Sequence, residues 1–242
     1  PPDINKGSGD FFVDGDGIRF GLSGLKSIGD GVTEVIHQEV VANGPFTSLE
    51  DFVGRLSGKE ANKRTIESFI LAGAFDSFGY NRHQMMIAYP AVLEQAAKDK
   101  KNSMSGQLSL MDFLGEEEKS DFRVKYPDVA EYDKDDLLAK EKEILGIYVS
   151  GHPLDDDLDI LEEYTTAKST DFIVNTEELA DGEVDAAAFD QQDQLVDKAG
   201  YTIGGMLTEI TKKTTRNGDE MAFLTVEDMF GTVEVVVFAR DY

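Results

Sequence analysis

The chain has 242 residues, no cysteine and a formal net charge of −25. These values exclude disulfides and thiolate metal sites, and they argue against a strong non-specific DNA binder, which would neutralise phosphates with Lys and Arg. The hydrophobic content of 40% suffices for one or two domains, and no run approaches the ~18 apolar residues of a membrane span.

The acidic excess is concentrated in residues 101–200, which hold 27 Asp and Glu against nine Lys and Arg. We interpret this stretch as a solvated surface, so that any contact with nucleic acid would be local, through backbone amides and a few cations. The chain opens with PPDIN, without Met and without a signal-peptide pattern. We therefore expect a piece of a longer, cytoplasmic protein.

Residues 1–20 are expected to be a lead-in that contains a β-hairpin. Phe11-Phe12-Val13 and Ile18-Arg19-Phe20 flank Asp14-Gly15-Asp16-Gly17, which is a hairpin-turn pattern.

Residues 21–36, GLSGLKSIGDGVTEVI, predict a helix, a tight turn and a second helix. The turn, 28–31, holds a Gly-x-Gly, and glycine both accepts a positive φ and lets another backbone approach closely. The second helix would begin at this turn, so its free N–H groups and positive dipole end could seat a phosphate. The alternative is an ordinary helical corner with a glycine C-cap.

A second helical pair is expected about fifty residues later. Residues 62–71, with Asn62 as the N-cap, and residues 81 to about 97 predict the two helices of this pair, with a glycine turn at 72–75 between them. Residues 48–56 predict a separate short amphipathic helix before the pair. The two pairs are expected to form a compact four-helix unit of the kind that clamps a DNA backbone. The candidate DNA-contacting residues are Lys26, Gly29, Asp30, Gly31, Lys63, Arg64, Gly73 and Arg82.

The alternative for Lys63, Arg64 and Arg82 is simple surface solvation. The second pair lacks a Gly-x-Gly, so it could serve mainly for packing.

Residues 98–106 are rich in Lys and Ser and are predicted to be a linker. A glutamine followed by apolar residues comes next, at 107–113. A solvated segment cannot bury these side chains by itself, so we expect it to dock, either on a partner or on its own chain.

Residues 133–148 predict a helix with acids in its first turns and lysines later. We interpret His152, before Pro153, as a turn residue, and Asp155-Asp156-Asp157 as a solvated cap without EF-hand spacing. Neither a nucleophile–His–acid grouping nor a set of metal ligands appears, so no catalytic and no metal-binding residue is assigned.

The last block, 201–242, predicts three antiparallel strands at about 201–210, 221–226 and 232–238. Such a meander matches the first half of an OB barrel, a fold that binds single strands. The candidate single-strand contacts are Lys212, Lys213, Arg216 and Phe223. The alternative is a solvent-facing meander whose lysines keep its loop soluble.

Several blocks, in this order, resemble a known family: PPDIN at 1–5, IRFGLSGLKSIGDG at 18–31, NKRTIESFILAGAFDSFG at 62–79, EKEILGIYVSGHPLD at 141–155 and MAFLTVEDMFGTVEVVVF at 221–238. The chain is similar to the C-terminal part of the bacterial replicative DNA polymerase III alpha subunits, the C-family polymerases. The block at 141–155 is the most specific of these.

The resemblance implies an α+β chain with a tandem helix-hairpin-helix domain, a mainly helical linker region and a partial OB-fold barrel. The expected parts are the end of the fingers region at 1–20, the helix-hairpin-helix domain at 21–97, a linker at 98–120, a helical connecting region at 121–199 and the first half of the OB domain at 200–242. The hairpin domain would hold duplex DNA, and the OB segment would contact the single-stranded template.

Residues 107–113 resemble the family's sliding-clamp motif, which makes docking on the beta sliding clamp the favoured expectation. Gln107 would bond the rim of the clamp pocket, and Leu108, Leu110 and Met111 would fill it. Met111 stands where an aromatic residue is usual, and Phe113 follows two residues on.

The resemblance also places the catalytic aspartates and the magnesium of the parent polymerase upstream, so no cofactor is expected in this segment. Its expected partners are DNA, the sliding clamp and other replicase subunits. Two other hypotheses remain open: a clamp-independent, error-prone paralogue of the polymerase, and a non-enzymatic adaptor in DNA repair.

Overall fold

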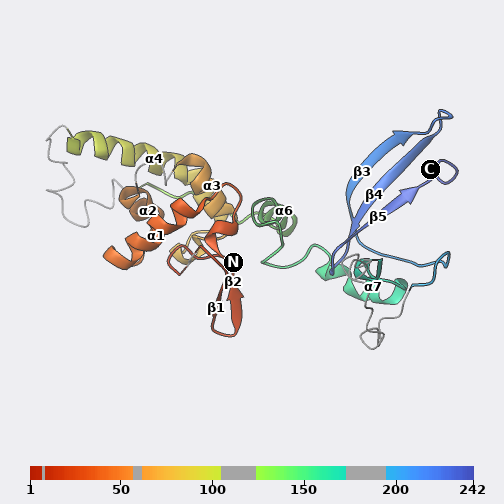
Figure 1. Ribbon diagram of the computed structural model, residues 1–242. Coiled ribbons are helices and arrows are strands. Elements are labelled where there is room, and N and C mark those ends of the chain that lie inside the picture. The colour runs from red at the N-terminus through yellow and green to blue at the C-terminus, as the bar shows by residue number, and fades with distance from the viewer. Residues whose placement is uncertain (7–8, 57–61, 105–123, 173–194) are drawn as a thin grey trace, which may run out of the picture. The chain divides into compact units, whose positions relative to one another are not determined.

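The computed structural model describes residues 1–6, 9–56, 62–104, 124–172 and 195–242. The chain divides into two compact units, Pro1–Gly151 and His152–Tyr242 (Figure 1). The first unit is mainly helical and the second carries a three-stranded sheet, so the chain is a mixed α+β protein, as the sequence predicted.

The expected hairpin opens the first unit and projects from it (Figure 1). Strand β1, Phe12–Asp14, pairs antiparallel with β2, Gly17–Arg19. Gly15 lies in the turn with φ +65°, which a glycine adopts without strain. Arg19 Nη2 holds Asp14 at 2.5 Å across the base of the turn.

The helix expected before the Gly-x-Gly turn is instead one short 3₁₀ turn, Leu22–Gly24, and this part of the prediction was wrong. Close packing explains the difference. A Cβ on Gly21 would overlap the backbone of Gly9 and Asp10, and one on Gly24 would meet the Phe20 ring at 2.7 Å. The chain is thus pressed against its own lead-in, where a regular helix does not fit.

Helix α1, Asp30–Asn43, begins where the sequence predicted. The positive φ, however, belongs to Ser27, at +72°, and not to the glycines of the Gly-x-Gly. Gly29 is extended, with φ −103°, and serves as the N-cap.

Three more helices complete the bundle. They are α2, Leu49–Arg55, α3, Lys63–Leu71, and α4, Arg82–Met104. The side chains of Ser48 and Asn62 cap α2 and α3 by accepting bonds from the N–H groups of Asp51 and Thr65. The predicted N-cap at Asn62 is therefore confirmed.

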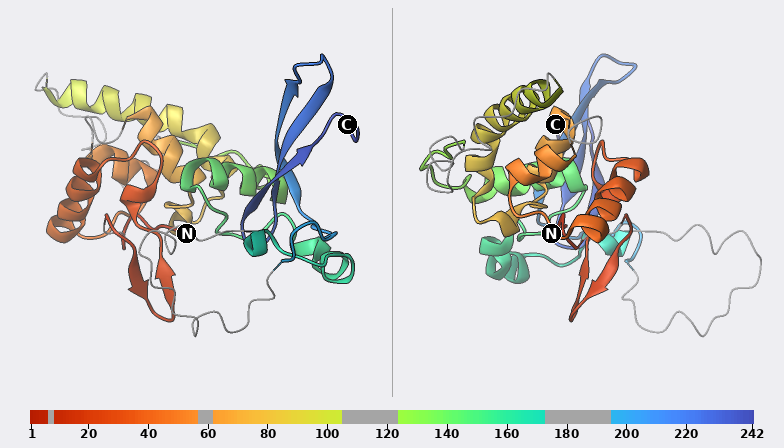
Figure 2. Two further views of the ribbon diagram at one scale, coloured as in Figure 1. Left: turned by 45° about the vertical axis from the view of Figure 1, so that its right-hand side comes forward. Right: turned by 90° about the vertical axis from the view of Figure 1, so that its left-hand side faces the viewer.

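Helix α4 runs further than predicted, because residues 98–104 continue it and do not form a linker. Side-chain pairs four residues apart support the beginning of this stretch: Lys98 bonds Glu94 at 2.7 Å and Gln95 bonds Asp99 at 3.1 Å. Figure 2 shows α4 as the long yellow helix lying beside the orange α2 and α3.

A cluster of phenylalanine rings fills the space between these helices. Phe52 is fully buried and makes edge contacts with the rings of Phe46, Phe69 and Phe75, at centroid distances of 5.0, 6.0 and 5.0 Å. Each such pair contributes about 0.5–1.5 kcal/mol beyond burial alone. The predicted compact helical unit is confirmed except for its first helix, which is the 3₁₀ turn Leu22–Gly24, and the phenylalanine cluster lies in its core.

Helix α6, Lys134–Leu145, packs on α3 and completes the first unit. The Asp133 side chain caps its start, and Gly146 ends it in the left-handed region with φ +77°. The helix thus ends at Leu145, three residues before the predicted end at residue 148.

The second unit begins with short helical pieces. They are the 3₁₀ turn Asp155–Asp157, helix α7, Leu158–Tyr164, and a second 3₁₀ turn, Ser169–Phe172. His152 lies in a turn, as predicted: its backbone N–H donates to Asp155 Oδ2 at 2.7 Å and its Nδ1 accepts from Leu154 N.

The predicted three-stranded meander is confirmed, with β3, Met206–Thr214, β4, Glu220–Glu227, and β5, Thr232–Val237, in the order β3-β4-β5. Strand β3 starts later and ends later than predicted, so the expected loop shrinks to residues 215–219. Within the described residues the sheet is open and forms no closed barrel.

A buried ion pair holds the first unit together, since Arg82 Nη1 on α4 lies 2.7 Å from Glu141 Oε1 on α6. Burial opposes ionisation of Glu141, but hydrogen bonds from Ser150 and Arg82 outweigh it and hold the pKa of this carboxyl below its usual value. A group whose pKa is lowered on folding stabilises the fold above its unfolded pKa. That contribution is lost as the pH falls through the folded pKa.

We predict that Glu141→Gln lowers the free energy of unfolding by about 3 kcal/mol at neutral pH, because it removes one of the two carboxylates that compensate the buried charge of Arg82 and leaves only Asp76. Urea unfolding measures the change. Glu143→Gln, at an exposed site on the same helix, should change it by less than about 0.5 kcal/mol. The difference in the free energy of unfolding between wild type and Glu141→Gln should become smaller below pH 4, because Glu141 of the wild type then becomes protonated. An equal effect of the two variants would contradict the central role of the pair.

Candidate nucleic-acid interface

The first turn of α1 offers backbone N–H groups to the surface. Its N-cap, Gly29, has no side chain to bond them, and within the described part of the chain the N–H groups of Asp30 and Gly31 have no hydrogen-bond acceptor. Both glycines are exposed, and a Cβ added at either would meet no atom within 4 Å. The start of α1 therefore offers two N–H donors without an acceptor, beside two glycines that carry no side chain.

The turn that aims these donors is held from two other helices. Lys26 N donates to the carbonyl of Ile144 at the end of α6, at 2.9 Å, and Ser68 Oγ on α3 donates to the carbonyl of Lys26 at 3.1 Å. Leu25 and Ile28, on either side of the left-handed Ser27, are buried. These contacts fix the direction in which α1 begins.

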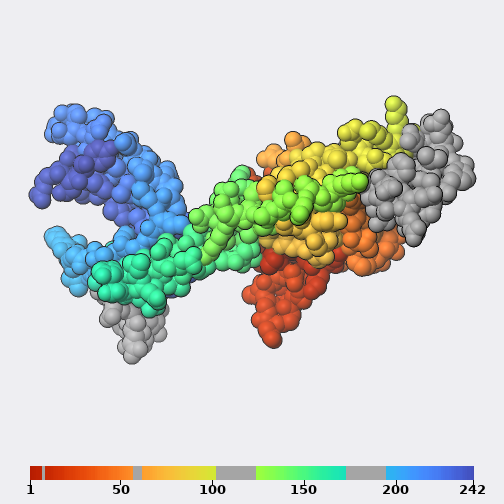
Figure 3. Space-filling model, turned by 180° about the vertical axis from the view of Figure 1, so that it is seen from behind, coloured from red at the N-terminus to blue at the C-terminus, as the bar shows by residue number. Residues whose placement is uncertain are grey.

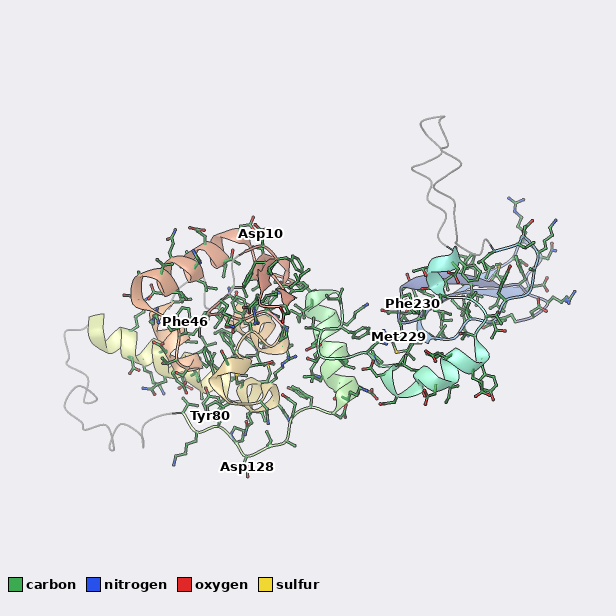
Figure 4. All side chains as sticks on the ribbon, turned by 90° about the horizontal axis from the view of Figure 1, so that it is seen from below. Asp10, Phe46, Tyr80, Asp128, Met229 and Phe230 are labelled. Carbon is green, nitrogen blue, oxygen red and sulfur yellow. The ribbon has the colours of Figure 1, made fainter. Side chains whose placement is uncertain are left out.

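The side chains around this site are acidic. A surface hollow next to it is lined by Gly9, Asp10, Ser23, Asp30, Gly31, Thr33, Glu34 and His37. Asp10 is labelled in Figure 4. Lys26 is exposed but forms an ion pair with Glu143 at 3.4 Å. Any attraction for a phosphate thus comes from backbone amides and the helix dipole rather than from a basic patch.

The second glycine turn is built for packing. Gly73 has φ +79°, and a Cβ there would overlap Arg82 Nη2. The guanidinium of Arg82 is buried. It donates to Asp76 at 2.9 and 3.1 Å, to Glu141 at 2.7 Å and to the carbonyl of Leu71 at 3.2 Å. Four segments therefore meet at one cation.

The first N–H groups of α4 already have hydrogen-bond acceptors in the chain. The N–H groups of Arg82 and His83 both donate to the Glu131 carboxylate, at 2.8 and 3.0 Å. Asn81 and Gln84 form a reciprocal capping box. In this structure the second helix pair thus has a carboxylate where the first pair has open space.

Residues 124–132 bring Glu131 to this position by lying across the bundle (Figure 3). The Tyr126 ring stacks on Tyr80 with a centroid distance of 3.8 Å, and Asn81 Nδ2 donates to the carbonyl of Val129 at 2.9 Å. Burial, with Glu50 nearby, raises the pKa of Tyr126.

The candidate DNA contacts therefore fall into two groups. Lys26, Gly29, Asp30 and Gly31 lie exposed at the first turn, and Lys63 and Arg64 lie exposed at the start of α3. Gly73 and Arg82 are buried within the bundle. Sequence reasoning missed Glu131 and Glu141, because both are single acids in an acidic stretch and their partners lie 48 to 59 residues away.

The candidate single-strand contacts do not share one face of the sheet. Lys213 pairs in register with Met221, and Phe223 pairs with Thr211. These residues share a face, where Lys213 Nζ lies 4.5 Å from the Phe223 ring centroid. Lys212 points to the opposite face, opposite Ala222, and Arg216 lies exposed in the loop. The candidate clamp residues, Gln107, Leu108, Leu110, Met111 and Phe113, lie outside the described residues.

Two further features concern metals and membranes. In the part of the chain that the structure describes, no group of three His, Asp or Glu residues could hold a metal ion. No described helix is both long and apolar enough to cross a membrane.

Comparison with known proteins bears on this geometry. The family model "Helix-hairpin-helix motif" matches residues 1–85, which include both glycine turns. The whole chain aligns with DNA polymerase III subunit alpha from Borreliella burgdorferi at 34% identity, from Deinococcus radiodurans at 35% and from Thermus aquaticus at 34%. The chain is homologous to one segment of bacterial DNA polymerase III alpha subunits. It spans 19%, 17% and 18% of the lengths of these three relatives.

The environment of Gly73 generates a stability prediction with an internal control. Gly73→Ala combines an unfavourable positive φ with overlap on the Arg82 guanidinium, so we expect a loss of about 2 kcal/mol or more. Gly79→Ala has a similar φ of +84° but open space for its Cβ, and should cost about 1 kcal/mol. Thermal or urea unfolding of both variants measures the difference. Equal losses would show that the glycine serves the turn alone.

Proposed function

We propose that this chain is a DNA-holding segment of a bacterial replicative DNA polymerase, and that it grips the backbone of duplex DNA at the first turn of α1. The observation that carries this proposal is the pair of N–H groups at Asp30 and Gly31, which have no hydrogen-bond acceptor within the described residues. The homology to polymerase III alpha subunits and the helix-hairpin-helix match support it.

The acidic charge of the chain limits the form that this grip takes. With few exposed cations near the site, one or two phosphates would be held by amides, and Lys63 and Arg64 at the start of α3 would add weak attraction. Such a contact positions the duplex without reading its sequence. The segment itself would supply no group to the polymerisation chemistry.

Two further contacts belong to the same proposal. The face of the sheet that holds Lys213 and Phe223 would take single-stranded template, since a cation beside an aromatic ring suits a stacked base and its phosphate. Residues 107–113 would dock on the beta sliding clamp. Their glutamine-apolar pattern supports this, with Met111 in place of the usual aromatic residue.

Gly31→Val tests the backbone grip. A Cβ at this exposed position meets no atom within 4 Å, so the fold should persist, but the added side chain would stand where a phosphate approaches. We expect duplex binding, measured by fluorescence anisotropy, to fall about tenfold. Gly54→Val is the matched control, because Gly54 is also an exposed helical glycine with open space around it, in α2. Unchanged binding in Gly31→Val would contradict the proposed grip.

A titration against the bacterial sliding clamp tests the second contact. We expect micromolar binding by this chain, lost in a Gln107→Ala/Leu108→Ala variant, because the pattern supplies one polar and several apolar anchors. Circular dichroism of the variant controls for folding. Absence of binding by the wild-type chain would favour the clamp-independent paralogue, and DNA binding could then still be tested by itself.

A further inference from the structure

The second unit contains an apolar groove that the proposed DNA and clamp contacts do not use. It has a volume of about 370 Å³ and lies between α7, the turn Ser169–Phe172 and the loop before β5. Its apolar lining consists of Leu158, Leu161, Ala167, Gly204, Met229 and Phe230. Figure 4 shows Met229 and Phe230 side by side at this loop.

The groove is held in shape by the loop that forms one of its walls. The Asp228 carboxylate accepts hydrogen bonds from the Ser169 N–H and hydroxyl, at 2.7 and 2.6 Å, and from the N–H groups of Phe230 and Gly231, at 2.8 and 3.0 Å. Gly204 forms part of the floor, and a Cβ there would meet Leu161 Cδ2 at 2.5 Å. Hydrogen bonds and close packing thus define the shape of the groove within the second unit.

The rim of the groove is negative. Glu162 and Asp171 lie on it and are exposed, and Glu162 has no hydrogen-bond or ion-pair partner within the described part of the chain. Residues 152–167, which include α7, carry six acids and no Lys or Arg. A surface of this charge repels nucleic acid and attracts cationic groups.

Lys168, the one cation in the lining, shows that the Phe230 ring can hold a positively charged group. Lys168 Nζ lies 4.2 Å from the centroid of the Phe230 ring, whose side chain is 56% exposed. An aromatic face that holds a cation inside an acidic rim is suited to an arginine or lysine next to an apolar anchor.

We propose that this groove, lined by Leu161, Phe230 and Glu162, docks a basic segment of a partner protein, with an apolar side chain in the groove and an Arg or Lys over Phe230. The chain's own segment 173–194 is a poor occupant, because it carries seven acids and no Lys or Arg. This contact goes beyond the proposed DNA and clamp contacts and does not depend on them.

The first step of the test is a selection from a displayed library of random 12-residue peptides on the intact chain. Enriched peptides should combine Arg or Lys with a neighbouring Leu, Ile or Phe. The best peptide is then titrated by fluorescence anisotropy at low and moderate salt, with binding weakening as salt rises.

Three variants locate the site. Glu162→Lys should weaken binding of the selected peptide about tenfold, while Glu163→Lys, the same charge change on the same helix but outside the groove, should have little effect. Lys168→Ala should strengthen binding, because it removes a like charge that competes for the Phe230 ring.

Three results would overturn the proposal. They are a selection without basic peptides, equal losses in Glu162→Lys and Glu163→Lys, and weaker binding in Lys168→Ala. Displacement of the peptide by a single-stranded oligonucleotide, with tighter oligonucleotide binding in Glu162→Lys, would assign the groove to nucleic acid instead.

Discussion

The first unit depends on one buried cation, the guanidinium of Arg82. It bonds the carbonyl of Leu71 at the end of α3, the carboxylate of Asp76 in the following turn and that of Glu141 on α6. Glu141 in turn accepts the N–H groups of Val149 and Ser150, at 3.1 and 2.9 Å. One network therefore joins the second glycine turn, two helices and the end of the unit, and each member is satisfied by another.

This network accounts for the different surfaces of the two glycine turns. In the second turn, Gly73 makes room for the guanidinium and Glu131 takes the first N–H groups of α4, so that turn is directed inward. In the first turn, the backbone of Lys26 is hydrogen-bonded to Ile144 and Ser68, which belong to other helices. The N–H groups of Asp30 and Gly31 at the start of α1 have no acceptor within the described residues. Helices α3 and α6, which the Arg82 network joins, thus also hold the turn that precedes α1.

The distribution of charge separates the proposed contacts. Backbone amides at α1 and the Lys213–Phe223 face suit nucleic acid, whereas the acidic groove of the second unit suits a basic protein segment. A strongly acidic chain can hold DNA only where local donors outweigh the overall repulsion. The same repulsion keeps the remaining surface available for protein partners.

Local patterns in the sequence were sufficient to predict most of the helices and strands. The two-residue hairpin turn at 15–16, the caps at Asn62 and Asp133 and the three strands follow from contacts within a few residues, which spacing and residue type reveal. The boundaries went wrong where long-range packing intervenes. The 3₁₀ turn at 22–24 is pressed on the lead-in. At residues 98–104, by contrast, a polar stretch that resembles a linker continues α4.

By itself, the sequence determined the α+β composition, the start of α1, the second glycine turn, the strand meander and the resemblance to polymerase III alpha subunits, because these depend on local chemistry and on blocks of sequence. The tertiary structure alone decided that Arg82 and Gly73 are buried, that Lys212 and Lys213 point to opposite faces and that an acid-rimmed groove exists. The physical reason is distance along the chain. Arg82 and Glu141 are 59 residues apart, and a single charge in an acidic stretch does not indicate which distant partner it will meet.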